Sequence, residues 1–212
     1  MASYLSCARG LASRPRRGHI WPMFIQTETT PNPEVLKFLP GREVAGEGSH
    51  DFRDMEAAQG SPLAADLFDI EGVQRVFFGP DFVTVGKDPH SAWPHLKAPI
   101  LAAIMDHFTS GRPLFTSEAA AQGGEVEEVY EGEVAQIVTE IKELLDSRIR
   151  PAVAQDGGDI LFSRFEADTG VVWLHMKGAC AGCPSSTATL KSGVENMLKH
   201  YVPEVTRVEQ TL

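Results

Sequence analysis

A glycine-containing, acidic segment divides this 212-residue chain in two. Residues 113–132 contain Gly123 and Gly124 and then four glutamates: Glu125, Glu127, Glu128 and Glu131. Glycine combined with dense like charge is typical of a flexible linker, and the start of a surface helix is the competing interpretation. The segments on either side, 23–112 and 133–212, are each long enough for a modest core without disulfides. We therefore predict two small domains joined by a linker.

The composition excludes several classes of protein. Hydrophobic residues make up 42% of the chain and charged residues 23%, as in globular rather than fibrous or disordered proteins. No apolar stretch approaches the ~18 residues of a transmembrane helix. The net charge of −10 disfavours nucleic acid and anionic lipid, which both bind a basic face. We expect neither nucleic acid nor a membrane as a partner.

The first 22 residues differ in composition from the rest. They contain four arginines and no acidic residue, which is typical of a mitochondrial transit peptide. The alternative is an unstructured extension in front of Met23, a residue at which translation can also begin. Because translation can begin at Met23, we expect the protein to lie in a bacterial cytoplasm, with the mitochondrial matrix as the alternative. Cys7, in this segment, is interpreted as a bystander, and three cysteines suit a reducing compartment.

Residues 23–112 predict an α+β domain. Ser61 and Pro62 form a good helix start, and apolar residues at spacings of three and four predict a second helix from Ser91 to Gly111. The polar, glycine-containing residues 41–60 predict a loop. Short apolar runs predict strands, the last two joined as a hairpin by Gly79-Pro80-Asp81. The predicted strands are 23–28, 35–39, 73–78 and 82–85.

Residues 133–212 predict a second α+β domain with the order helix, strand, strand, helix, strand. The first helix carries an apolar stripe from Val134 to Ile149, which Pro151 interrupts or kinks. Asp156 and Asp159 flank two glycines and are interpreted as turn residues rather than a catalytic carboxylate pair. The later elements are predicted at 160–165, 171–177, 184–201 and 205–208.

Cys180 and Cys183 form a Cys-x-x-Cys motif in a loop that we expect to be exposed. This spacing brings two sulfurs close enough for one metal centre or a disulfide. Cys183 precedes Pro184, a preferred first helical residue, and is predicted to be the N-cap. The helix dipole, helped by Lys177, then favours the thiolate, which is the form that ligates metals.

Four uses of the motif are compatible with the residues. A zinc site within one chain needs about four ligands, and a thioredoxin-like redox pair needs more sheet after the motif than remains. Two inert buried cysteines are the third use. The fourth is half of a site, to which two chains contribute four thiolates, the ligand set of an iron–sulfur cluster. The residues favour this last use and leave the others open.

The sequence resembles the Nfu family of iron–sulfur cluster proteins over nearly all of its expected folded length. Residues 23–112 are similar to the family's N-terminal domain, through FIQTETTPNPEVLKFLPG, SPLAADLF and EGVQRVFFGPDFVTV. Residues 133–210 are similar to the NifU C-terminal domain, through IKELLDSRIRPAVAQDGGDI and GACAGCPSSTATLKSGVENML. Only residues 1–22 lie outside the pattern.

The resemblance implies that Cys180 and Cys183 ligate a [4Fe–4S] cluster shared between two protomers, so that the loaded form is a homodimer. It further implies a scaffold or carrier that receives the cluster from upstream donors and delivers it to apo-proteins, without substrate turnover. Two rivals remain: a thiol–disulfide oxidoreductase that uses the same cysteines, and a zinc-linked dimer that acts as an adaptor.

Overall fold

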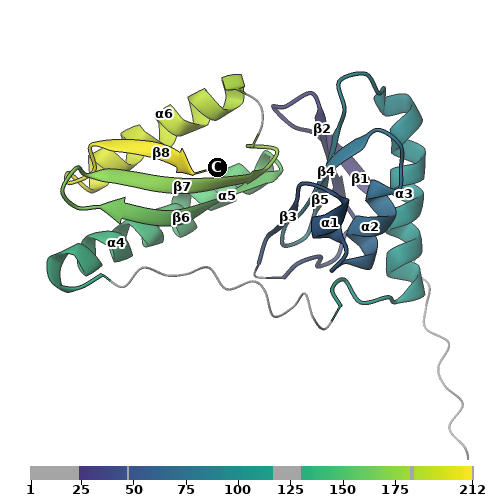
Figure 1. Ribbon diagram of the computed structural model, residues 1–212, viewed down its shortest axis with the longest axis horizontal. Helices are drawn as coiled ribbons and strands as arrows, with labels where there is room; N and C mark the ends of the chain where they lie inside the picture. Colours follow the sequence, from purple (N-terminus) through teal and green to yellow (C-terminus); the bar gives the residue numbers. More distant parts are fainter. Residues whose placement is uncertain (1–23, 47, 117–129, 182–183, 212) are drawn as a thin grey trace, which may run out of the picture.

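The computed structural model describes residues 24–46, 48–116, 130–181 and 184–211. It has two β-sheets, one on each side of residues 117–129, and each is packed with helices (Figure 1). The predicted α+β class is therefore confirmed. No helix in the described parts is long and apolar enough to cross a membrane.

The N-terminal sheet has the strand order β1-β2-β5-β4-β3, and all neighbouring strands are antiparallel. The predicted hairpin is present as β4 and β5, which pair in the middle of this sheet. Its strands are β1 (Gln26–Thr29), β2 (Val35–Leu39), β3 (His50–Phe52), β4 (Val73–Phe78) and β5 (Val83–Lys87). The helices of this domain are α1 (Met55–Ala58), α2 (Pro62–Phe68) and α3 (Trp93–Ser110).

One face of this sheet forms the domain's core with α2 and α3. Alternate residues of the strands point to this face, as the two-residue period of a strand requires. The core includes Leu36, Phe38, Val76, Phe78, Val83, Val85, Leu63, Leu67, Ile100 and Ile104. The helix ends follow the sequence prediction: the Ser61 side chain accepts from the N–H of Ala64, and Gly111 ends α3 with φ 68°.

The loop predicted at 41–60 is wrong in part, because it contains β3 and α1. Strand β3 is only three residues long, and Phe52 alone is buried among them, so it carries no visible alternation. It pairs with β4 and forms the edge of the sheet. Helix α1 is one turn long and is capped by the Asp54 carboxylate, which accepts from the N–H of Ala57 at 2.8 Å. Both elements are too short for periodicity to detect.

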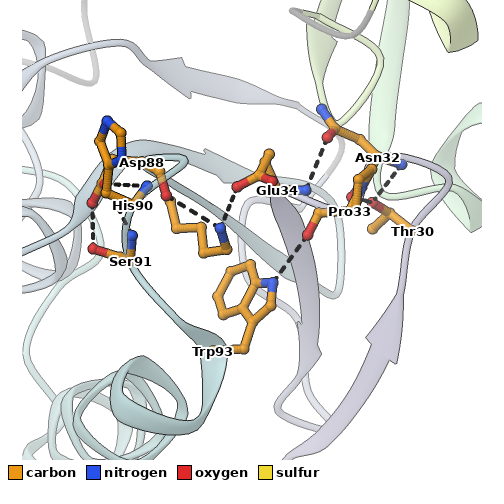
Figure 2. Close-up of polar contacts among 9 residues, drawn as sticks. Thr30, Asn32, Pro33, Glu34, Asp88, His90, Ser91 and Trp93 are labelled. Carbon is orange, nitrogen blue, oxygen red and sulfur yellow. Dashed lines mark hydrogen bonds and ion pairs between the residues drawn. The ribbon is translucent and has the colours of Figure 1, made fainter.

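The turn between β1 and β2 is held by polar contacts, which Figure 2 shows. The Thr30 hydroxyl donates to the carbonyl of Asn32 at 2.8 Å, and Oδ1 of Asn32 accepts from the N–H of Glu34 at 3.0 Å. The indole N–H of Trp93, the first residue of α3, donates to the carbonyl of Pro33 at 3.0 Å. Residues 31–33, Pro-Asn-Pro, therefore form the turn between β1 and β2, and α3 helps to fix its position.

The C-terminal domain has the predicted order of elements. Strand β7 is antiparallel to β6 and parallel to β8. The elements are α4 (Gly132–Leu144), the π-helical turn η2 (Leu145–Ile149), α5 (Arg150–Gln155), β6 (Gly158–Glu166), β7 (Val171–Gly178), α6 (Pro184–Tyr201) and β8 (Arg207–Thr211). The last strand begins two residues later than predicted, because Val205 is buried in the turn before it.

Pro151 interrupts the first helix of this domain without ending it. Proline has no N–H to donate within a helix, and a wider π-helical turn is one way to accommodate such a residue. Here η2 ends at Ile149, two residues before Pro151, and the chain continues as α5. The apolar stripe stays intact across the change, since Ile141, Leu145, Ile149 and Val153 are all buried in the core.

The ends of the predicted linker contact the two domains. The carbonyl of Leu114 accepts from the Ser61 hydroxyl at 2.6 Å, and the N–H of Thr116 donates to the carbonyl of Gly60 at 2.9 Å. The hydroxyl of Tyr130 accepts from the N–H of Phe165 at 2.9 Å. The predicted glycine pair and three of its four glutamates lie outside the described residues.

Candidate metal centre

Cys180 lies in a tight loop that follows β7. Gly178, the last residue of β7, pairs with Gly158 at the start of β6 and has φ 64°. The N–H of Ala179 donates to the carbonyl of Gly157 at 3.2 Å, and that of Ala181 donates to the carbonyl of Gly178 at 3.2 Å. These bonds turn the chain back, so that Cys180 lies over the Gly157-Gly158 pair.

Gly158 is the residue on which the Cys180 sulfur rests. A Cβ atom added to Gly158 would lie 2.6 Å from Sγ of Cys180 and 2.7 Å from the carbonyl oxygen of Lys177. It would also lie 3.1 Å from the backbone nitrogen of Cys180. These distances are shorter than a carbon atom tolerates, so glycine is required for this approach. The sequence predicted a turn at Gly158, but not that this glycine makes room for the Cys180 sulfur.

The Cys180 side chain is buried, and the expectation of an exposed loop is wrong for this residue. It is 7% exposed and belongs to the apolar core of the C-terminal domain. Burial, together with the nearby negative charges of Asp156 and Asp159, raises the pKa of the Cys180 thiol to about 12. Cys180 is therefore a neutral thiol in this arrangement.

Cys183 lies outside the described residues, so its expected place at the N-cap of α6 stays a prediction. Helix α6 does begin at Pro184, as predicted. In the described part of the chain, no three His, Cys, Asp or Glu side chains converge in a way that would hold a metal ion. The structure therefore places one of the two predicted ligands and does not describe the other.

An ion pair fixes the start of β6 beside the cysteine loop. The Arg150 guanidinium donates from Nε and Nη2 to the two carboxylate oxygens of Asp159, at 2.8 and 2.9 Å. It also bonds Asp146 at 3.0 Å, and these two carboxylates raise the pKa of Arg150. Asp159 is 6% exposed and also accepts from the N–H of Ile160. The sequence indicated Asp159 as a turn residue and did not predict its partner, nine positions away.

Comparison with known proteins identifies the family. A model of the scaffold protein Nfu/NifU N-terminal domain matches residues 25–111, and one of the NifU-like domain matches residues 141–209. The NifU-like protein 5, mitochondrial, of Arabidopsis thaliana is 52% identical over 188 residues, which cover 89% of this chain and 68% of the relative. The chain belongs to the Nfu family.

Two further Nfu-family relatives agree with this assignment. The NifU-like protein 4, mitochondrial, of Arabidopsis thaliana is 54% identical, over 89% of this chain and 66% of the relative. The NFU1 iron-sulfur cluster scaffold homolog, mitochondrial, of Drosophila ananassae is 52% identical, over 89% of this chain and 64% of the relative. The chain thus spans about two thirds of the length of these relatives. The resemblance found in the sequence motifs is confirmed.

The relatives correct one prediction. All three are named as mitochondrial proteins, and this finding overturns our expectation of a bacterial cytoplasm. That expectation depended on Met23 as an alternative start, which is a feature of one residue and carries no information about the compartment. Residues 1–22 lie outside the described residues.

Proposed function

We propose that this chain is a scaffold and carrier for a [4Fe–4S] cluster, which it delivers to apo-proteins. Cys180 and Cys183 of two copies provide the four thiolates. The observation that carries the proposal is the Cys-x-x-Cys pair between β7 and α6, whose first sulfur rests on a glycine with no side chain in the way. Relatives named as iron–sulfur cluster scaffolds support the same function.

The donor set suits a shared cluster. Each chain offers two sulfurs in the motif, and a [4Fe–4S] cluster takes four thiolates, so two chains complete one site. Asp156 and Asp159 lie near Cys180 and disfavour its thiolate, so they oppose loading until iron is present. Bound iron supplies the positive charge that keeps a coordinating thiol deprotonated. A site with few protein ligands per chain also releases its cluster without unfolding either domain.

Anaerobic reconstitution with iron and sulfide tests this function. We expect a broad visible absorption band and about four irons and four sulfides for two chains. Zinc binding without sulfide uptake would indicate the adaptor instead. Reversible formation of a Cys180–Cys183 disulfide, with thiol–disulfide exchange and no iron uptake, would indicate the oxidoreductase. Either result would contradict the proposal.

The relatives' names also bear on the compartment. We propose a mitochondrial location, with residues 1–22 as the transit peptide, because this segment is basic and contains no acidic residue. Import of a reporter fused to residues 1–22 into isolated mitochondria tests this. The same fusion with its four arginines replaced by glutamine is expected to stay outside. Equal import of both fusions would contradict the proposal.

A further inference from the structure

The N-terminal sheet has a second buried face, turned away from its own core. Lys37, Thr84 and Phe77 lie side by side on β2, β5 and β4, since Thr84 pairs with both of the others. They alternate with core residues along each strand, so they point away from α2 and α3. Yet they are 6%, 2% and 1% exposed. An antiparallel sheet with helices on one side usually leaves its other face to solvent, so something else covers this row.

The C-terminal domain covers it, at the side of the sheet opposite α3 (Figure 1). The Lys37 ammonium group donates to the carbonyls of Ala154 and Gln155, at 2.9 and 3.2 Å. These carbonyls lie at the C-terminal end of α5, where the helix dipole favours a cation. Lys37 is thereby bonded across the boundary between the two domains.

The remaining contacts lie on the glycines that surround the cysteine loop. A Cβ atom on Gly157 would lie 2.8 Å from Cγ2 of Thr84, and one on Gly178 would lie 2.9 Å from Cδ1 of Phe77. Gly157 bonds the backbone of the residue before Cys180, and Gly178 is two positions before it. The row on the N-terminal sheet therefore packs directly against Gly157 and Gly178, the two glycines that flank the Cys180 loop.

We infer that the N-terminal sheet face, defined by Lys37, Thr84 and Phe77, is an interaction surface for the cluster-free Cys180 loop of the same chain, and that it leaves this loop when a cluster is bound. The inference rests on the proposed function, since a cluster shared by two copies requires their cysteine loops to face each other. A second copy that approached the loop at Gly157 and Gly178 would have to displace the N-terminal sheet face. Contacts between domains of one chain are commonly small enough to be reversible.

Chemical labelling of Lys37 tests the release. The Lys37 side chain is 8% exposed in the docked arrangement, and we expect acetylation by an N-hydroxysuccinimide ester, followed by mass spectrometry, to be about tenfold faster in the cluster-loaded full chain. Lys87 is the matched control, because its side chain is also 8% exposed but pairs with Glu34 within the N-terminal domain. Its labelling should not change on loading. Protection of Lys37 in fully loaded protein would overturn the inference.

A cluster-free experiment separates this inference from the proposed function. In a background of Cys7→Ser and Cys183→Ser, Lys37→Met should raise the alkylation rate of Cys180 about tenfold, while Lys87→Met should leave it unchanged. Thr84→Glu, which places a carboxylate against Gly157, is a second variant in case Lys37→Met misfolds. An unchanged Cys180 rate in a folded Lys37 or Thr84 variant overturns the inference. Failure of the wild-type chain to take up iron, with the Cys180 rate raised, contradicts only the proposed function.

Discussion

Gly158→Ala is expected to displace Cys180 and to prevent most cluster uptake. The added carbon would lie 2.6 Å from the sulfur and 2.7 Å from the backbone oxygen of Lys177, and a backbone atom cannot turn aside as a flexible side chain does. Overpacking of this kind costs about 1–3 kcal/mol of unfolding free energy. Thermal or urea unfolding of the cluster-free protein measures the loss of stability, and iron content after reconstitution measures uptake.

Gly193→Ala is the matched control for this substitution. Gly193 lies within α6 and has no atom within 4 Å of an added Cβ. The same change should therefore raise stability by about 0.5–1 kcal/mol, because alanine favours a helix more than glycine does. Cluster uptake should stay at the wild-type level. If Gly158→Ala loads as fully as Gly193→Ala, Gly158 does not position the sulfur.

Cys180→Ser and Cys183→Ser are each expected to abolish stable cluster binding. A serine hydroxyl is rarely ionised near neutral pH and replaces a thiolate poorly, and in a two-fold dimer each substitution removes two of four ligands. Iron and sulfide content after anaerobic reconstitution and desalting measures the effect. Cys7→Ser is the control, since this residue lies outside the motif, and it should load normally.

The Cys180 variant should also lose stability, which corrects the expectation that follows from an exposed loop. Cys180 is buried among apolar side chains, and a hydroxyl in such a place costs about 1–3 kcal/mol when it is poorly bonded. Cys180→Ala avoids this penalty and still removes the ligand. A stable cluster in a folded Cys180→Ala protein would exclude Cys180 from the ligand set, whatever the serine variant does.

Much of the fold could be predicted from the sequence because its long elements are regular. The stripe from Val134 to Ile149 and the spacing of Leu96, Ile100 and Ile104 each specify one buried helix face. Ser61 and Gly111 mark helix ends by their own backbone chemistry. Such signals are local, so they can be read from neighbouring residues. Strand β3 and helix α1 were missed because three or four residues carry no period.

The features around the candidate site could not be predicted in the same way, because they join residues far apart in the chain. The motif indicated Cys180, but its burial depends on the apolar core around Gly158 and β7. The Lys37 ammonium group meets carbonyls more than a hundred positions later. Lys37 lies in an apolar strand, and nothing in its neighbouring sequence indicates that its ammonium group bonds these carbonyls. Only the packing of the two domains reveals it.

The central claim, a cluster held between two copies of this chain, is tested most directly by the mass of the loaded protein. Native mass spectrometry under anaerobic conditions gives the number of chains, irons and sulfides in one particle. We predict two chains with one [4Fe–4S] cluster, and a shift to single chains when a chelator removes the iron. A single chain that carries a complete four-iron cluster, or two chains joined by zinc without sulfide, would contradict the claim.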